Sequence, residues 1–129
     1  MTQTYQHVLA ALDALRPIMM QKGLSGATQI ALMRLWRALG EPAAVFADAE
    51  LAAVRAHGHL EDDGKTIAFR DDDARAAYTA AIAEMRAAEI APIPPVVLRP
   101  DAVFFAATDP GQLAALAPFI EFAEGSEST

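Results

Sequence analysis

Between Ser25 and Gly58 the sequence reads GATQIALMRLWRALGEPAAVFADAELAAVRAH, and this stretch decides the fold. Large apolar residues of its first half recur at steps of three and four, the period of an amphipathic helix. They are Ile30, Leu32, Met33, Leu35, Trp36 and Leu39. Because they cover a wide arc, this helix should contact more than one neighbour. Ser25 is a suitable N-cap and Gly58 a suitable C-terminal stop.

The middle of the same stretch contains Gly40, Glu41 and Pro42. Proline in a helix interior removes a backbone donor, clashes with the carbonyl four residues earlier, and costs about 3 kcal/mol. We therefore expect a break or sharp bend at residues 40–42. Beyond it a helix resumes, with Ala44, Ala47, Leu51 and Val54 on one face.

The composition favours one helical domain. The chain has 129 residues, 53% of them hydrophobic, and much of that fraction is alanine, a strong helix former. The absence of cysteine excludes disulfides, thiolate metal sites and cysteine nucleophiles. The start, MTQTYQ, lacks the basic and apolar regions of a signal peptide, so we expect a cytoplasmic protein. Residues 1–122 should form the domain, and residues 123–129, AEGSEST, a disordered acidic tail.

The net charge of −7 is unevenly spread. Residues 1–40 carry four basic residues and one acidic residue, whereas residues 41–89 carry five basic and eleven acidic residues. Because phosphate binding needs a basic surface, we expect no direct contact with nucleic acid. No stretch is apolar enough to suggest a membrane, and no small-molecule substrate is evident.

The flanking segments complete the predicted fold. Residues 4–15 and 72–89 have helical periodicity, and Thr108-Asp109-Pro110 is typical of the start of a short C-terminal helix. Residues 59–69 predict a β-hairpin whose turn contains Asp62, Asp63 and Gly64. The expected fold is mainly α: a three-helix bundle with a small β-hairpin, a proline-rich extended arm and a short C-terminal helix.

The closest approach to a chemical site is the pair His57 and His59, followed by Glu61 and two aspartates. Imidazole and carboxylate can together hold zinc or manganese, but this spacing matches no established site. The acids at both ends of the hairpin are explained by turn formation and by capping of the next helix. We therefore predict no catalytic residue, no cofactor and no metal ion.

The proline-rich arm is the best candidate for an interaction surface. Three prolines in IAPIPPVVL, residues 90–98, exclude a helix and impose an extended path. The arm and the residues after it carry more apolar side chains than a small bundle needs, namely Val96, Val97, Leu98, Val103, Phe104 and Phe105. We expect them to contact a protein partner or a second copy of this chain. The alternative, that the arm only covers its own bundle, stays open.

The order of segments carries a resemblance to a known group of proteins. The segments are LAALDAL, SGATQIALMRLW, DGKTIAF, AAYTAAIAEMRAAE, PPVVL and DPGQLAALAPFIEF. Together they resemble small uncharacterised helical proteins encoded in tailed-phage and prophage gene blocks, although Pro42 interrupts what is usually one continuous helix. The resemblance implies a phage accessory or virion-assembly protein in the bacterial cytoplasm or the virion. It brings no reaction or catalytic residue.

The leading hypothesis is therefore a non-enzymatic phage or prophage protein that acts by protein–protein interaction. One alternative is an acidic inhibitor of a host defence or DNA-binding protein, for which the net charge of −7 is suited. Another is a small metal-dependent enzyme that uses the region of His57 and His59.

Overall fold

The computed structural model describes residues 2–99 and 102–123, which are mainly helical. The helices are α1 (Tyr5–Met19), α2 (Gly26–His57), α3 (Asp72–Ala87), α4 (Ala102–Ala107), α5 (Pro110–Leu116) and a 3-10 turn at Ala117–Phe119. The strands are β1 (Gly58–Leu60), β2 (Ile67–Phe69), β3 (Val96–Leu98) and β4 (Ile120–Phe122). The predicted mainly helical fold is confirmed, and so is the hairpin, in which β1 pairs with β2 antiparallel.

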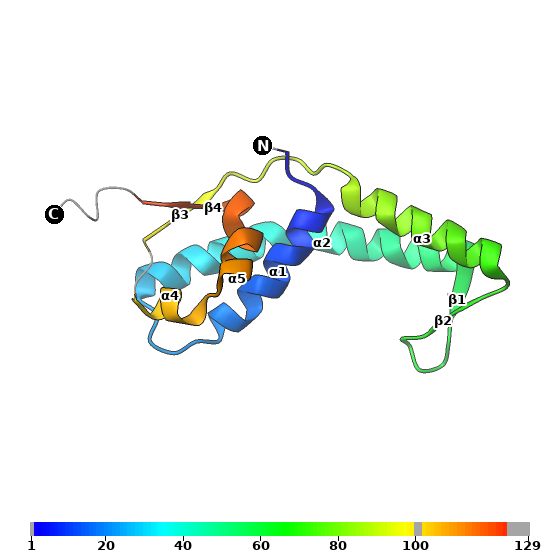
Figure 1. The fold of residues 1–129 in the computed structure, drawn as a ribbon, viewed down its shortest axis with the longest axis horizontal. Coiled ribbons are helices and arrows are strands. Elements are labelled where there is room, and N and C mark those ends of the chain that lie inside the picture. Colours follow the sequence, from blue (N-terminus) through cyan, green and yellow to red (C-terminus); the bar gives the residue numbers. More distant parts are fainter. Residues whose placement is uncertain (1, 100–101, 124–129) are drawn as a thin grey trace.

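Helix α2 is the longest element, and α1, α3, β1 and β3 all contact it. Its 32 residues span about 48 Å at 1.5 Å per residue. Figure 1 shows α1 crossing the first part of α2 and α3 lying along the second part, while α4 and α5 lie at the α1 end. The two flanking helices thus cover successive lengths of α2, and the hairpin sits at the far end.

The expected break at Gly40–Pro42 is wrong, because α2 continues through Pro42 without interruption. A proline removes only one hydrogen bond of the helix, and tertiary packing can offset that loss. Here both α1 and α3 pack against α2, with α1 crossing its first part and reaching Phe46 through Tyr5, and α3 lying along its second part (Figure 1). Helix α1 likewise contains Pro17 and continues to Met19.

The core lies at the α1 end of the molecule. Its fully buried large side chains come from α1, the first half of α2, the arm, α4 and the C-terminal segment, residues 110–123: Val8, Leu15, Ile18, Leu32, Leu35, Leu39, Leu98, Phe104, Leu116 and Phe119. Trp36 packs at the edge of this cluster, half-buried, with the Arg16 guanidinium carbon 5.9 Å from its ring centroid. Helix α3 has no fully buried residue, so the hairpin end is the less tightly packed part.

Gln3 ties the proline-rich arm to the rest of the chain. Its buried side-chain amide donates hydrogen bonds to the backbone oxygens of Ile93 and Pro118, both at 3.0 Å. Its side-chain oxygen accepts from the Ile93 amide at 2.6 Å, and its backbone oxygen accepts from the Ile90 amide at 3.0 Å. One side chain therefore joins the N-terminus, the arm and the C-terminal segment.

We expect Gln3→Ala to lower the free energy of unfolding by roughly 1–3 kcal/mol, because backbone groups of Ile93 and Pro118 lose their partner in a buried place. Urea unfolding followed by circular dichroism measures the change. The matched control is Gln6→Ala, whose side chain accepts only an exposed hydrogen bond from Arg86, and which should cost less than about 0.5 kcal/mol. Equal losses for the two variants would contradict the role assigned to Gln3.

Candidate protein-interaction surface

The six residues predicted as an interaction surface separate into two groups. Leu98 and Phe104 are fully buried, and Val96 and Val103 are half-buried against the core. Only Val97 and Phe105 are exposed, at 60% and 51% of their surface. Most of the predicted set therefore packs within this chain, which is the alternative that the sequence left open.

The arm ends in a strand that pairs with the C-terminal segment. Strand β3 runs parallel to β4, with Val96 opposite Ile120, and the Ala123 amide donates to the Leu98 oxygen at 2.9 Å. Because side chains alternate along a strand, Leu98 points to the core and Val97 points away. Ala123, the first residue of the predicted tail, is held against β3 by this hydrogen bond. Residues 124–129 lie outside the described part of the chain.

Three phenylalanines meet beside this strand pair. Helix α4, which the sequence did not predict, places Phe104 in the core and the next residue, Phe105, outside. The ring centroids are 5.7 Å apart for Phe104 and Phe105, 6.4 Å for Phe104 and Phe122, and 6.1 Å for Phe105 and Phe122. Phe122 is 43% exposed. We call Phe105 and Phe122 the aromatic pair.

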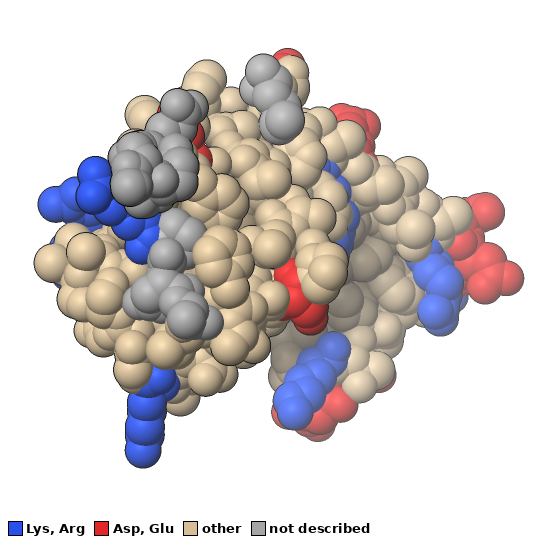
Figure 2. Space-filling view, turned by 60° about the vertical axis from the view of Figure 1, so that its left-hand side comes forward, with Lys and Arg blue, Asp and Glu red and all other residues tan. Residues whose placement is uncertain are grey.

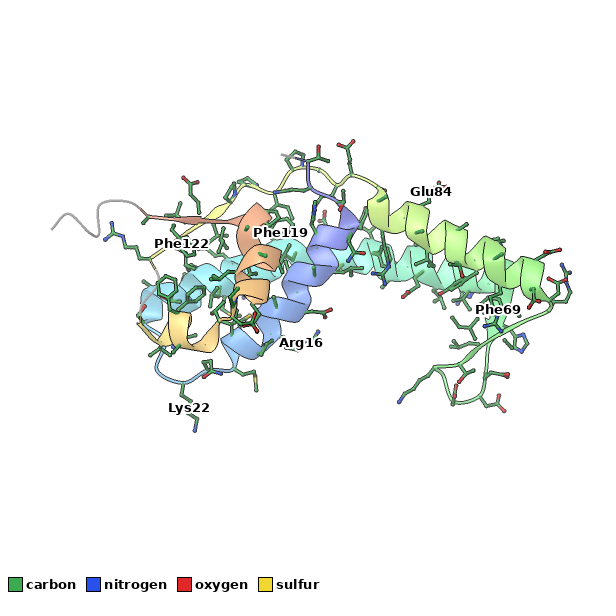
Figure 3. All side chains as sticks on the ribbon, viewed as in Figure 1. Arg16, Lys22, Phe69, Glu84, Phe119 and Phe122 are labelled. Carbon is green, nitrogen blue, oxygen red and sulfur yellow. The ribbon has the colours of Figure 1, made fainter. Side chains whose placement is uncertain are left out.

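The aromatic pair lies at one end of the elongated molecule. Figure 3 places Phe122 at the end opposite the hairpin residue Phe69, and Figure 2 brings this end forward. Among the described residues visible there in Figure 2, most are uncharged, and the Lys, Arg, Asp and Glu side chains lie mainly toward the margins. Phe122 was missed from the sequence because the segment around it follows a helix start and has only three strand residues. The alternation of Ile120, Glu121 and Phe122 between apolar and charged residues was the available sign of a strand.

The region of His57 and His59 forms a separate hollow. It has a volume of about 540 Å³ and lies between the end of α2, the hairpin and the start of α3. It is lined by Arg55, Ala56, His57, Gly58, His59, Phe69, Arg70, Asp73, Ala74 and Ala77. The His59 Nε2 atom lies 3.8 Å from a Glu61 carboxylate oxygen, and both side chains are well exposed. Within residues 2–99 and 102–123, no three His, Cys, Asp or Glu side chains converge as metal ligands.

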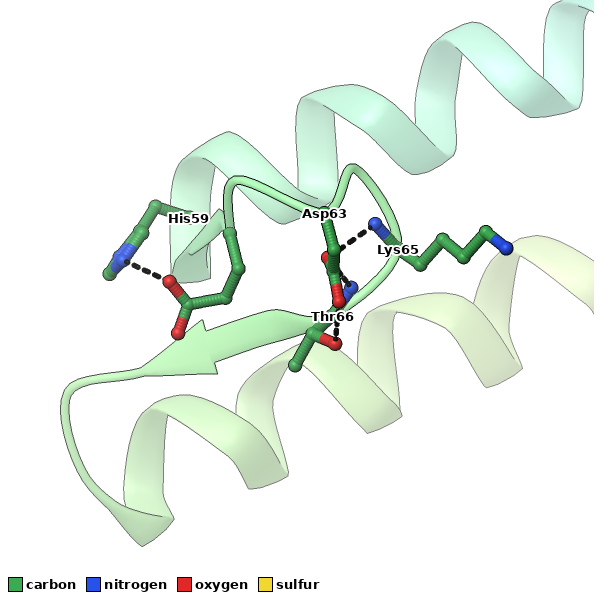
Figure 4. Close-up of polar contacts among 5 residues, drawn as sticks. His59, Asp63, Lys65 and Thr66 are labelled. Atoms are coloured by element: carbon green, nitrogen blue, oxygen red, sulfur yellow. Dashed lines mark hydrogen bonds and ion pairs between the residues drawn. The ribbon is translucent and has the colours of Figure 1, made fainter.

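Two of the hairpin acids, Asp63 and Asp71, have the turn and capping roles that the sequence predicts. The Asp63 carboxylate accepts hydrogen bonds from the Lys65 amide at 2.8 Å, the Thr66 amide at 2.8 Å and the Thr66 hydroxyl at 2.6 Å (Figure 4). These bonds, led by that of the Thr66 hydroxyl, lower the pKa of Asp63 to about 2. Asp71 caps α3 by accepting from the Ala74 amide at 2.8 Å, and this bond lowers its pKa.

Comparison with protein-family models, curated proteins and solved structures finds no match for this chain. No helix among the described residues combines the length and the apolar character needed to cross a membrane.

The hydrogen bonds to Asp63 should produce a pH-dependent hairpin turn. Since the pKa falls from 3.8 to about 2 on folding, the charged carboxylate stabilises the turn fully above pH 3.8, and this contribution is lost as the pH falls through about 2. In an NMR titration the Lys65 and Thr66 amide signals should shift with a midpoint near 2. Asp63→Asn should abolish the shift. A midpoint near 3.8 would show that these bonds do not favour the charged form.

Adjacent phenylalanines in α4 should differ sharply in their contribution to stability. Phe104→Ala removes a fully buried ring and should cost about 3–5 kcal/mol. Phe105→Ala removes a ring that is 51% exposed and should cost less than about 1.5 kcal/mol. Denaturant unfolding of the two variants checks the difference. Similar losses would contradict the inward and outward placement of these two residues.

Proposed function

We propose that this chain is a non-enzymatic phage or prophage protein that binds another protein in an accessory or virion-assembly role. The observation that supports this most strongly is the aromatic pair, which exposes two phenylalanine rings next to each other at one end of the molecule. The resemblance of the segment order to phage and prophage proteins supports the setting, in the bacterial cytoplasm or the virion.

The aromatic pair rests on a buried residue that holds both rings in place, which suits the pair to binding a partner. Both rings contact Phe104, which is fully buried, so their positions are held before a partner arrives. Pre-ordered side chains lose less entropy on binding, and aromatic residues are enriched in the buried centres of interfaces. Burial of two such rings can therefore supply the centre of a protein–protein contact.

The strand pair beside the rings offers a second mode of contact. Among the described residues, β3 pairs only with β4, so each strand has one edge without a strand partner. An exposed strand edge can accept an extended segment of another protein through backbone hydrogen bonds. Val97, on the outward side of β3, would contact such a segment. The proposed contact surface therefore keeps Val97 and Phe105 from the surface predicted from the sequence, and it adds Phe122.

A photoreactive phenylalanine analogue in place of Phe105 tests the proposal in cells in which the phage is replicating. We expect it to cross-link to a phage structural or assembly protein, identified by mass spectrometry. The same analogue in place of Leu60, which is 45% exposed in the hairpin at the far end, should not.

A second change separates docking from chance proximity. Phe122→Asp should remove the cross-link from position 105, because it places a charge within the contact, while circular dichroism stays unchanged. The proposal is wrong if positions 60 and 105 capture the same proteins, or if Phe122→Asp leaves the cross-link intact.

A further inference from the structure

Helix α2 carries an exposed seam that no other described segment of the chain covers. The seam contains seven residues spaced alternately by three and four: Ile30, Met33, Arg37, Gly40, Ala44, Ala47 and Leu51. This is the spacing of the contact positions of a coiled coil. All seven are exposed, and Arg37 is the one charged residue among them. We call these seven residues the outer seam.

The packing of α2 leaves the outer seam free. Its buried residues, among them Leu32, Leu35, Leu39 and Phe46, lie on the opposite side, where the other helices pack. The large apolar side chains of the seam remain in solvent, with Ile30 at 57% exposure. A stripe of this length on the longest helix is what a partner helix requires.

Within the described part of the chain, neither backbone conformation nor close packing requires a glycine at position 40. It lies in the middle of α2, where glycine weakens a helix relative to alanine, and its φ is not positive. A Cβ atom added there would meet nothing within 4 Å. Gly40, Ala44 and Ala47 are the small residues in the middle of the outer seam. Because their side chains are short, the backbone of a second helix could approach α2 closely there.

The charges beside the seam identify the partner and its direction. Arg34 and Arg37 lie in its first half, and Glu41 and Asp48 lie in its second half. A parallel copy would place like charges opposite each other, whereas an antiparallel copy places the basic half against the acidic half. The complementary surface is therefore present on this chain itself.

We propose that a second copy of this chain binds antiparallel along the outer seam. In this register Gly40 faces Ala44 of the second copy, Met33 faces Leu51 of the second copy, and Arg37 comes close to Asp48 of the second copy. A hollow of about 280 Å³ beside Met33, lined also by Met19, Leu24 and Leu32, can receive the incoming leucine. This interface does not use the aromatic pair, so it stands or falls independently of the proposed function.

The lack of native cysteine allows a direct test of the register. The single variants Met33→Cys and Leu51→Cys are mixed in the full chain, treated with a mild oxidant, and separated on a non-reducing gel. We expect a cross-linked dimer from the mixture and little from either variant alone. Ala83→Cys, an exposed position on α3, is the control for random collision.

Light scattering of the cysteine-free chain provides the second measurement. The wild type should be a dimer that dissociates on dilution, and Ala44→Glu should be monomeric, while Ala83→Glu and Phe122→Asp should remain dimeric. Circular dichroism checks that each variant stays helical. Cross-linking of Met33→Cys to itself would indicate a parallel pair and overturn the proposal, as would a wild type that is monomeric at every concentration.

Discussion

The packing of α1 against the first half of α2 is the contact on which the rest of the structure depends. Buried Val8, Leu15 and Ile18 of α1 belong to one cluster with Leu32 and Leu35 of α2. An isolated helix containing Gly40 and Pro42 would be weak, because both residues disfavour helix interiors. Once α1 covers its first half, α2 has a stable start from which it can continue past the proline and support α3 and the hairpin.

Contacts with this core fix the path of the proline-rich arm, residues 90–98. Its prolines exclude a helix but do not choose where the segment lies. Gln3, just before α1, supplies hydrogen bonds to Ile93 and Pro118, and Leu98 enters the core beside Phe104 and Phe119. The pairing of β3 with β4 then places Phe122 against the rings of α4. The aromatic pair is thus a product of three segments that are distant in the sequence.

The two ends of the molecule differ in physical character. The α1 end holds the buried core and presents the aromatic pair, whereas the hairpin end carries exposed aspartates and a helix with no fully buried residue. Acidic turn and cap residues at the hairpin end stabilise local backbone, as the bonds of Asp63 and Asp71 show. An aromatic surface on the well-packed end would lose less entropy on docking than one on the lightly packed end.

The sequence by itself determined the features that depend on near neighbours: the helical periods of α1, α2 and α3, the Asp-Gly hairpin turn, the cap at Asp71 and the start of α5 after Asp109. Each of these follows from side-chain pattern or local hydrogen bonding within a few residues. Only the tertiary structure decided the course of α2 through Pro42, the pairing of β3 with β4, and which of Phe104 and Phe105 faces outward. Those outcomes depend on packing and backbone pairing between distant segments, which can override local preference and which a single sequence does not display.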